Sequence, residues 1–204
     1  DLVYGLPHQT VESVGRTLAD VIAIEPDRIA VFGYAHLPQR LKHQRMIDEK
    51  TLPGPAERFL QSQHIAERLR DAGYVQIGID HFARSTDVLA SGAVARNFQG
   101  YTTDTADALL AFGASAISRL PHGFVQNAVA VDDYTRRISA EGLAVVRGHE
   151  LAGDDALRAY LIERLMCAFF VSWRDLKQRF GAEVPRLRFE AEAAARRDAD
   201  GLVA

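Results

Sequence analysis

The first hundred residues alternate short β-forming runs with amphipathic helical stretches, and this alternation limits the fold more than any other feature. Residues 28–34 read RIAVFGY, an almost continuously apolar run that is typical of a strand buried on both faces of a parallel sheet. Thr10 can cap a helix that ends before Pro26, and a second helix is predicted over 55–72. The pattern predicts an α/β fold with helices packed outside a sheet or barrel. Its three parallel strands are expected at 1–4, 28–34 and 74–79.

Polar and turn-forming residues follow each predicted strand. The carboxyl ends of parallel strands meet at one edge of a sheet, where α/β proteins place their chemistry. We therefore expect these segments to lie on one edge and to form a site. They are 5–8 (GLPH), 35–38 (AHLP) and 80–84 (DHFAR).

Asp80 and His81 are the residues of this edge best suited to proton chemistry. A histidine titrates near neutral pH, and a carboxylate beside it fixes its tautomer, so the two predict an acid–base or orienting pair. The alternative is a carboxylate that caps the next helix beside a surface histidine. His64 lies on the apolar side of its helix and is expected to be a core or boundary residue. The histidines form no known ligand pattern, so no metal site is predicted.

Two segments further along also suit a bound molecule. Residues 96–103 read RNFQGYTT, a mixture of amide, aromatic, glycine and hydroxyl groups that an amphipathic helix would not use. We interpret this run as a loop that wraps a ligand. Residues 113–115 (GAS) predict a compact turn that lets a ligand approach the backbone, or only a tight turn at a strand end.

The alternation of predicted strands and helices gives way to a mainly helical pattern near residue 129. Helices are predicted over 131–141 and 154–171, then over a short stretch that begins after Ser172 and ends at Gly181, then over 186–199. A turn and the start of a strand follow at 200–203. This order is typical of a winged-helix domain, so we predict one domain over 1–128 and a mainly helical second domain over 129–204.

Charge and cysteine content narrow the functional classes. The net charge of −3 argues against a nucleic-acid partner. A single cysteine, Cys167, excludes a disulfide framework and fits a cytoplasmic protein. It lies in an apolar helix, and the chain has no nucleophile elbow or phosphate loop, so hydrolase and nucleotide-fold interpretations fail. No apolar run is long enough to span a bilayer, so no membrane partner is expected.

Four motifs, in the order in which they occur, resemble the oxygen-independent coproporphyrinogen III oxidases, which are radical S-adenosylmethionine (SAM) enzymes of haem biosynthesis. They are residues 1–7, 34–38, 80–84, and 96–103 followed by 112–118. The resemblance implies reductive cleavage of SAM at a [4Fe-4S] cluster and radical decarboxylation of two propionates of coproporphyrinogen III to give protoporphyrinogen IX. It also implies a porphyrinogen substrate, an electron donor for the cluster and a monomeric full-length enzyme.

The family's cluster is held by a Cys-x-x-x-Cys-x-x-Cys loop after its first strand, and this chain contains no such motif. Residues 1–4 also resemble a strand entered midway. We therefore expect a fragment that lacks the cluster-binding half and is inactive alone. The resemblance implies the second half of a partial (β/α) radical-SAM barrel, followed by a winged-helix-like domain that is cut before its wing ends.

The resemblance assigns three cofactor-binding residues, because members of the family bind two SAM molecules. Asp1 and Ala35 match contacts to the second SAM, and Ile117 matches an apolar contact to the SAM on the cluster. It assigns no catalytic residue. Ala111 and His8 depart from the family's usual glycine and lysine.

Two related functions stay open: a haem chaperone and a non-catalytic porphyrin-binding relative. The chaperone branch typically has His-Asn-x-x-Tyr-Trp and then Gly-Ala-His-Ser at the positions where this chain has residues 96–101 and 113–116. That difference favours the oxidase.

Overall fold

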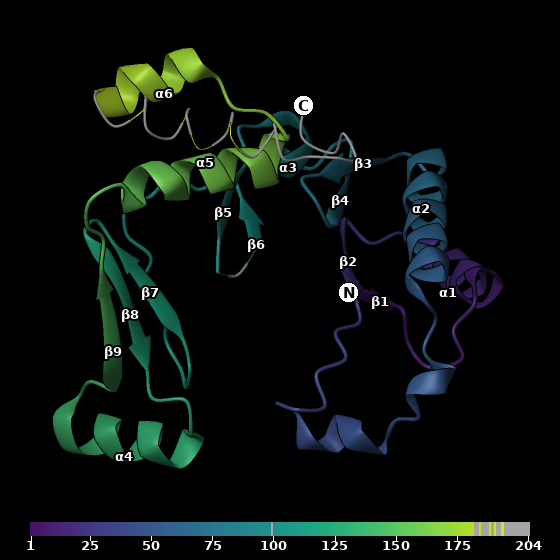
Figure 1. The fold of residues 1–204 in the computed structure, drawn as a ribbon, viewed down its shortest axis with the longest axis horizontal. Helices are drawn as coiled ribbons and strands as arrows, with labels where there is room; N and C mark the ends of the chain where they lie inside the picture. Colours follow the sequence, from purple (N-terminus) through teal and green to yellow (C-terminus); the bar gives the residue numbers. More distant parts are fainter. Residues whose placement is uncertain (99, 182–183, 185–187, 189, 191–192, 194–204) are drawn as a thin grey trace. The chain divides into compact units, whose positions relative to one another are not determined.

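The computed structural model of the chain describes residues 1–98, 100–181, 184, 188, 190 and 193. The chain forms two compact units, Asp1–Val94 with Tyr101–Thr103, and Ala95–Gly100 with Asp104–Ala204. Figure 1 shows the elements of both units along the chain. Each unit is described by itself.

The first unit is built on a four-stranded sheet with the order β1-β2-β4-β3. β1 (Leu2–Tyr4) runs parallel to β2 (Arg28–Gly33), whereas β4 (His81–Arg84) is antiparallel to both β2 and β3 (Tyr74–Ile77). The three predicted strands therefore share one direction, but they are not three parallel neighbours. Residues 81–84, expected as a polar segment at the end of the preceding strand, form a strand of their own. A turn at Gly78, with φ of 54°, reverses the chain at once and makes β3 and β4 a hairpin.

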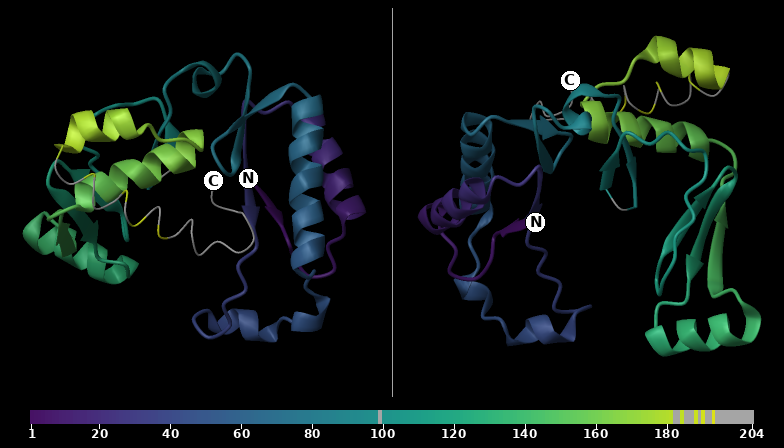
Figure 2. Two further views of the ribbon diagram at one scale, coloured as in Figure 1. Left: turned by 45° about the horizontal axis from the view of Figure 1, so that its top comes forward. Right: turned by 180° about the vertical axis from the view of Figure 1, so that it is seen from behind.

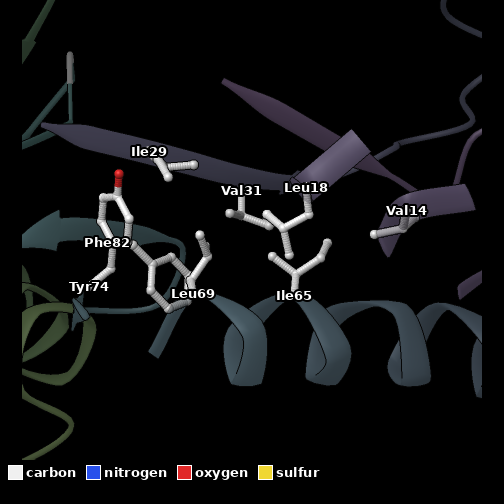
Figure 3. Packing of buried hydrophobic residues seen from close by; sticks show 8 residues of the cluster. All are labelled: Val14, Leu18, Ile29, Val31, Ile65, Leu69, Tyr74 and Phe82. Atoms are coloured by element: carbon white, nitrogen blue, oxygen red, sulfur yellow. The ribbon is translucent and has the colours of Figure 1, made fainter. Parts of the chain in front are cut away.

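Two helices pack on one face of this sheet, as the sequence predicts. α1 (Val11–Ile24) begins with a capping box in which Thr10 and Ser13 bond to each other's backbone, and α2 (Pro55–Asp71) has a proline in its first turn. Between β2 and α2 lie two short 3₁₀ helices, η1 (Lys42–Met46) and η2 (Glu49–Thr51), and α3 (Val88–Ser91) follows β4. Figure 3 shows the buried residues between helices and sheet: Val14, Leu18, Ile29, Val31, Ile65, Leu69, Tyr74 and Phe82.

The second unit contains a three-stranded antiparallel sheet of β7 (Ile117–Leu120), β8 (Gly123–Asn127) and β9 (Val145–Glu150). α4 (Val131–Glu141) joins β8 to β9 and lies across one end of the sheet in Figures 1 and 2. The helices α5 (Asp155–Ala168) and α6 (Trp173–Phe180) follow, and they share a core of Leu157, Leu176 and Val184. The Ser172 cap and the end of α6 at Gly181 are confirmed.

Two features of this part of the chain differ from the sequence interpretation. Residues 96–103 are not an open loop, because β5 (Ala95–Asn97) and β6 (Gly100–Thr102) pair as a two-stranded sheet. The boundary predicted at 128/129 falls inside the β7-β8-β9 sheet, since β9 pairs with β8 across it. The predicted helix over 186–199 lies largely, and the strand start at 200–203 wholly, outside the described residues.

Among the described residues, none of the helices combines the length and the apolar character that crossing a bilayer requires.

Replacing Leu69 by alanine tests the core of the first unit. Leu69 is fully buried, so Leu69→Ala leaves a cavity and should lower the free energy of unfolding by about 2–5 kcal/mol. Leu60 on the same helix is 54% exposed, so Leu60→Ala should change it by less than about 1 kcal/mol. Urea unfolding followed by circular dichroism measures both, and equal losses would contradict this packing.

Candidate functional site

Two loops leave the carboxyl ends of the parallel strands β1 and β2, and we call residues 5–9 and 34–38 together the rim. The parallel pairing places Tyr4 opposite Gly33, and the amide of Tyr34 donates a hydrogen bond of 2.7 Å to the carbonyl of Tyr4. The two loops therefore start side by side, as the sequence predicts for consecutive parallel strands.

Gln61 of α2 fixes the first rim loop. Its side chain is fully buried, its Oε1 accepts from the amide of Gly5 at 2.9 Å, and its Nε2 donates to the carbonyl of Gln9 at 2.8 Å. Buried backbone groups need partners, and here one side-chain amide satisfies two of them. The buried side chain of Gln61 thus joins the loop after β1 to α2.

Arg58, one turn earlier on α2, bonds to the second loop and lies close to the first. Its Nη2 donates to the carbonyl of Tyr34 at 2.8 Å. A Cβ on Gly5, whose φ is +83°, would lie 2.9 Å from Arg58 Nε, and a Cβ on Gly33 would lie 3.1 Å from Nη2. The guanidinium therefore occupies the space that these two glycines leave open, and a larger residue at Gly5 would displace it.

Gln44 holds the second rim loop around Ala35. It is buried, its Nε2 donates to the carbonyl of Ala35 at 3.0 Å, and its Oε1 accepts from the amide of Leu37 at 2.5 Å. His36 lies between Tyr34 Oη, 3.3 Å from Nδ1, and Glu49 Oε1, 3.3 Å from Nε2. The second contact lacks hydrogen-bond geometry, and the buried Nε2 has no hydrogen-bond partner among the described residues. Ala35 itself stays exposed on this fixed backbone.

The structure brings Asp80 and His81 together. Asp80 Oδ1 lies 2.8 Å from His81 Nδ1, and both side chains are mostly buried. Asp80 belongs to the turn before β4, which lets two consecutive side chains meet. The imidazole makes edge contacts with Phe32 at 5.9 Å and with Tyr101 at 4.9 Å. Nδ1 facing the carboxylate leaves Nε2 as the nitrogen that can exchange a proton.

The alternative reading of Asp80 as a helix cap is wrong. The helix after β4 is α3, and Asp87 is its cap, with its carboxylate accepting from the amide of Leu89 at 2.8 Å. Asp87 also accepts from Arg28 Nε at 2.8 Å, and this charge-assisted bond lowers the pKa of Asp87. The acid–base role of the Asp80–His81 pair stays a prediction.

The residues matched by resemblance fall in both units. In the first unit, Asp1 is exposed at the amino end of β1, and Ala35 follows the carboxyl end of β2. They therefore lie at opposite ends of the β1-β2 pair. Ile117 is half-buried at the start of β7 in the second unit, opposite Gln126 of β8.

The turn at 113–115 is confirmed and is held on several sides within the second unit. Asn127 Nδ2 donates to the carbonyl of Gly113 at 3.0 Å, and the amide of Ser115 donates to the carbonyl of Ala128 at 2.8 Å. Gly113 and Ser115 have φ values of 109° and 62°, in the region that favours glycine. The turn presents Ile117 from a fixed backbone.

His64 and Cys167 lie where the sequence places them. His64 is a half-buried boundary residue between α1 and α2, with Nε2 only 3.0 Å from the point where a Cβ on Gly15 would lie. Cys167 is half-buried in α5, and burial, helped by Glu163, raises the pKa of its thiol. A thiol with a raised pKa is a poor nucleophile and a poor thiolate ligand.

Sequence reasoning missed the three side chains that hold the rim: Gln44, Arg58 and Gln61. A signal for Gln61 was present, because it precedes the buried residues Ile65 and Leu69 at intervals of four on the apolar side of α2. A polar residue in such a stripe needs buried partners. Which backbone groups it meets depends on the fold.

Curated proteins of one name match this chain over its whole length. No family model matches. The chain is 48% identical over 207 positions to the oxygen-independent coproporphyrinogen III oxidase of Bradyrhizobium diazoefficiens, covering 100% of this chain and 46% of that protein. It is 41% identical to the protein of the same name from Pseudomonas aeruginosa, covering 99% and 47%. The chain thus spans about half the length of these relatives.

A solved structure is similar in fold as well as in sequence. It is the coproporphyrinogen III oxidase of Escherichia coli, described as a radical SAM enzyme, which matches with a TM-score of 0.88 and 38% identity. The match covers 96% of this chain and 46% of that one.

Removing the amide of Gln61 tests the rim. Gln61→Leu keeps the size of the side chain but leaves the amide of Gly5 and the carbonyl of Gln9 without their partner, which should cost about 2–4 kcal/mol of unfolding free energy. Gln63→Leu, at an exposed position of the same helix, is the control. Thermal unfolding compares the two, and a stable Gln61→Leu protein would contradict the role assigned to this amide.

Proposed function

Because the chain is homologous over its whole length to the oxygen-independent coproporphyrinogen III oxidases, we propose that it forms part of such an enzyme. The proposed reaction is the oxidative decarboxylation of coproporphyrinogen III to protoporphyrinogen IX in haem biosynthesis. The observation that carries the proposal is the combined match in sequence and fold to the Escherichia coli radical SAM enzyme. The parallel β1-β2 pair and its rim would belong to the second half of a partial (β/α) barrel.

The residues of this chain do not fit an iron–sulfur cluster. Three thiolates are needed where SAM occupies one iron, and the chain has one cysteine, a half-buried thiol with a raised pKa. No group of three metal-binding side chains gathers in the part of the chain that the structure describes. The cluster and its electron donor would therefore act through a segment outside this chain.

Asp1 and Ala35, at the two ends of the β1-β2 pair, suit a SAM molecule. Asp1 offers an exposed carboxylate to a cationic ligand, and Ala35 offers a small exposed side chain on a backbone fixed by Gln44. Asp1 adjoins Leu2, the partner of Val31, so it is about five residues from Ala35 along the β1-β2 pair. At about 3.3 Å per residue this is roughly 16 Å, which suits the two ends of an extended ligand.

The other site residues of this chain would have separate roles in the reaction. When bound, SAM would supply the radical chemistry that removes a hydrogen atom from a propionate side chain. Ile117 would give an apolar contact to the SAM on the cluster, whereas Asp1 and Ala35 would orient the second SAM. The Asp80–His81 pair would hold a proton at His81 Nε2, because Asp80 occupies the Nδ1 side.

Turnover by the full-length protein tests this function. Purified anaerobically with its cluster, it should consume SAM and release carbon dioxide from coproporphyrinogen III, whereas the chain of 204 residues alone should bind no cluster and show no turnover. Tight stoichiometric haem binding without turnover would instead support a haem chaperone. Porphyrin binding without SAM cleavage would support a non-catalytic relative.

Replacing Asp1 by asparagine tests its contact with the second SAM. Asp1→Asn keeps the shape and removes the charge, so the use of SAM by the full-length enzyme should weaken roughly 10- to 100-fold. Asp20→Asn, on the exposed face of α1, is the matched control. Isothermal titration with SAM beside a melting curve separates binding from stability, and a folded variant with unchanged affinity would remove Asp1 from the site.

A further inference from the structure

The second unit contains a cavity of about 930 Å³ that the assignments above do not use. It lies between the end of β5, the turn that joins β7 to β8, and one side of α5. Phe98 and Phe124 meet edge to face on its wall, with ring centroids 5.4 Å apart. The volume is at the upper end of the range for sites that bind organic molecules, so it suits a large ligand.

α5 forms the opposite wall with side chains that leave room. Ala156 and Ala159 line the cavity, and Ile162 follows with 55% of its surface exposed. The other side of the same helix is already used, since Leu157 is buried against α6. α5 therefore presents a second, mostly apolar side to the cavity, in which two alanines leave room for a ligand.

Arg119 of β7 supplies a positive charge to this apolar space. Its Nη2 donates to the carbonyl of Ala106 at 2.8 Å, which holds the side chain in place. Its buried Nε has no hydrogen-bond partner among the described residues. A guanidinium has five N–H donors in a planar fork, and only one hydrogen bond of the terminal nitrogens is to Ala106, so these nitrogens keep donors for a carboxylate.

The cavity also has acidic groups, Glu163 on α5 and Asp107 beside Ala106. A ligand with carboxylates alone would be repelled by them. A porphyrinogen carries both kinds of group, because its propionates accept hydrogen bonds and its pyrrole N–H groups donate them. Its ring surface is otherwise apolar, as the cavity wall is.

We propose that this cavity binds the porphyrinogen substrate, with Arg119 contacting a propionate carboxylate and the ring lying against Phe124 and α5. The proposal rests on the proposed function, for which it names the substrate-binding surface. Arg119 here is a binding residue for the substrate side chain and is separate from the residues proposed to contact SAM.

Two pairs of variants of the full-length protein test the cavity. Arg119→Gln removes the charge, and its control is Arg147→Gln, at an exposed position of β9 outside the cavity. Ala159→Phe fills the cavity from α5, and its control is Ala140→Phe, at an exposed position of α4. The measurements are the Kd for coproporphyrin III by fluorescence titration, the KM for coproporphyrinogen III, and the melting temperature.

Arg119→Gln and Ala159→Phe should each raise the Kd and the KM about tenfold, with melting temperatures close to wild type, while both controls stay within twofold. Unchanged Kd and KM in a folded Ala159→Phe protein that still turns over substrate would overturn the cavity assignment and leave the proposed function standing. A wild-type protein that binds coproporphyrin at the cavity without turning over coproporphyrinogen would overturn the function alone. No porphyrin binding by wild type would overturn both.

Discussion

The first unit depends on how two polar side chains of one helix satisfy the backbone of two loops. Gln61 and Arg58 bond to the chain after β1 and after β2, respectively, and the glycines at positions 5 and 33 leave the space that the guanidinium fills. Ile65 and Leu69, further along α2, are buried where this helix packs against the sheet. The apolar contacts fix where α2 lies, and the polar contacts convert that position into a fixed loop geometry.

The same arrangement bears on the exposed residues that are proposed as ligand contacts. The methyl side chain of Ala35 cannot hold the loop in place. Gln44 does so instead, because it bonds to the carbonyl of Ala35 and the amide of Leu37 at the same time. Ile117 follows a turn that β8 holds through Asn127 and Ala128. Ala35 and Ile117, two of the three proposed cofactor contacts, are thus presented by backbone that other elements fix, which would lower the entropic cost of binding.

Several helix ends could be predicted from the sequence because they depend on local residues. Each of these ends is determined by a few adjacent residues, and each was predicted. They are the Thr10 cap, the start of α2 at Pro55, the Ser172 cap and the end of α6 at Gly181. The strands β4 and β9 were not, because their identity depends on pairing with β2 and β8 far along the chain. The same limit hid Arg58 and Gln61, whose partners lie more than twenty residues away. The family motifs located Asp1, Ala35 and Ile117, whose contacts with SAM stay predictions.

An anaerobic crystal structure of the full-length protein with SAM tests the central claim most directly. We expect one SAM against Ala35 with its charged end near Asp1, a second SAM in contact with Ile117 at the cluster, and the backbone of the rim unchanged. SAM bound elsewhere, with the surface around Asp1 and Ala35 in contact with protein only, would contradict it.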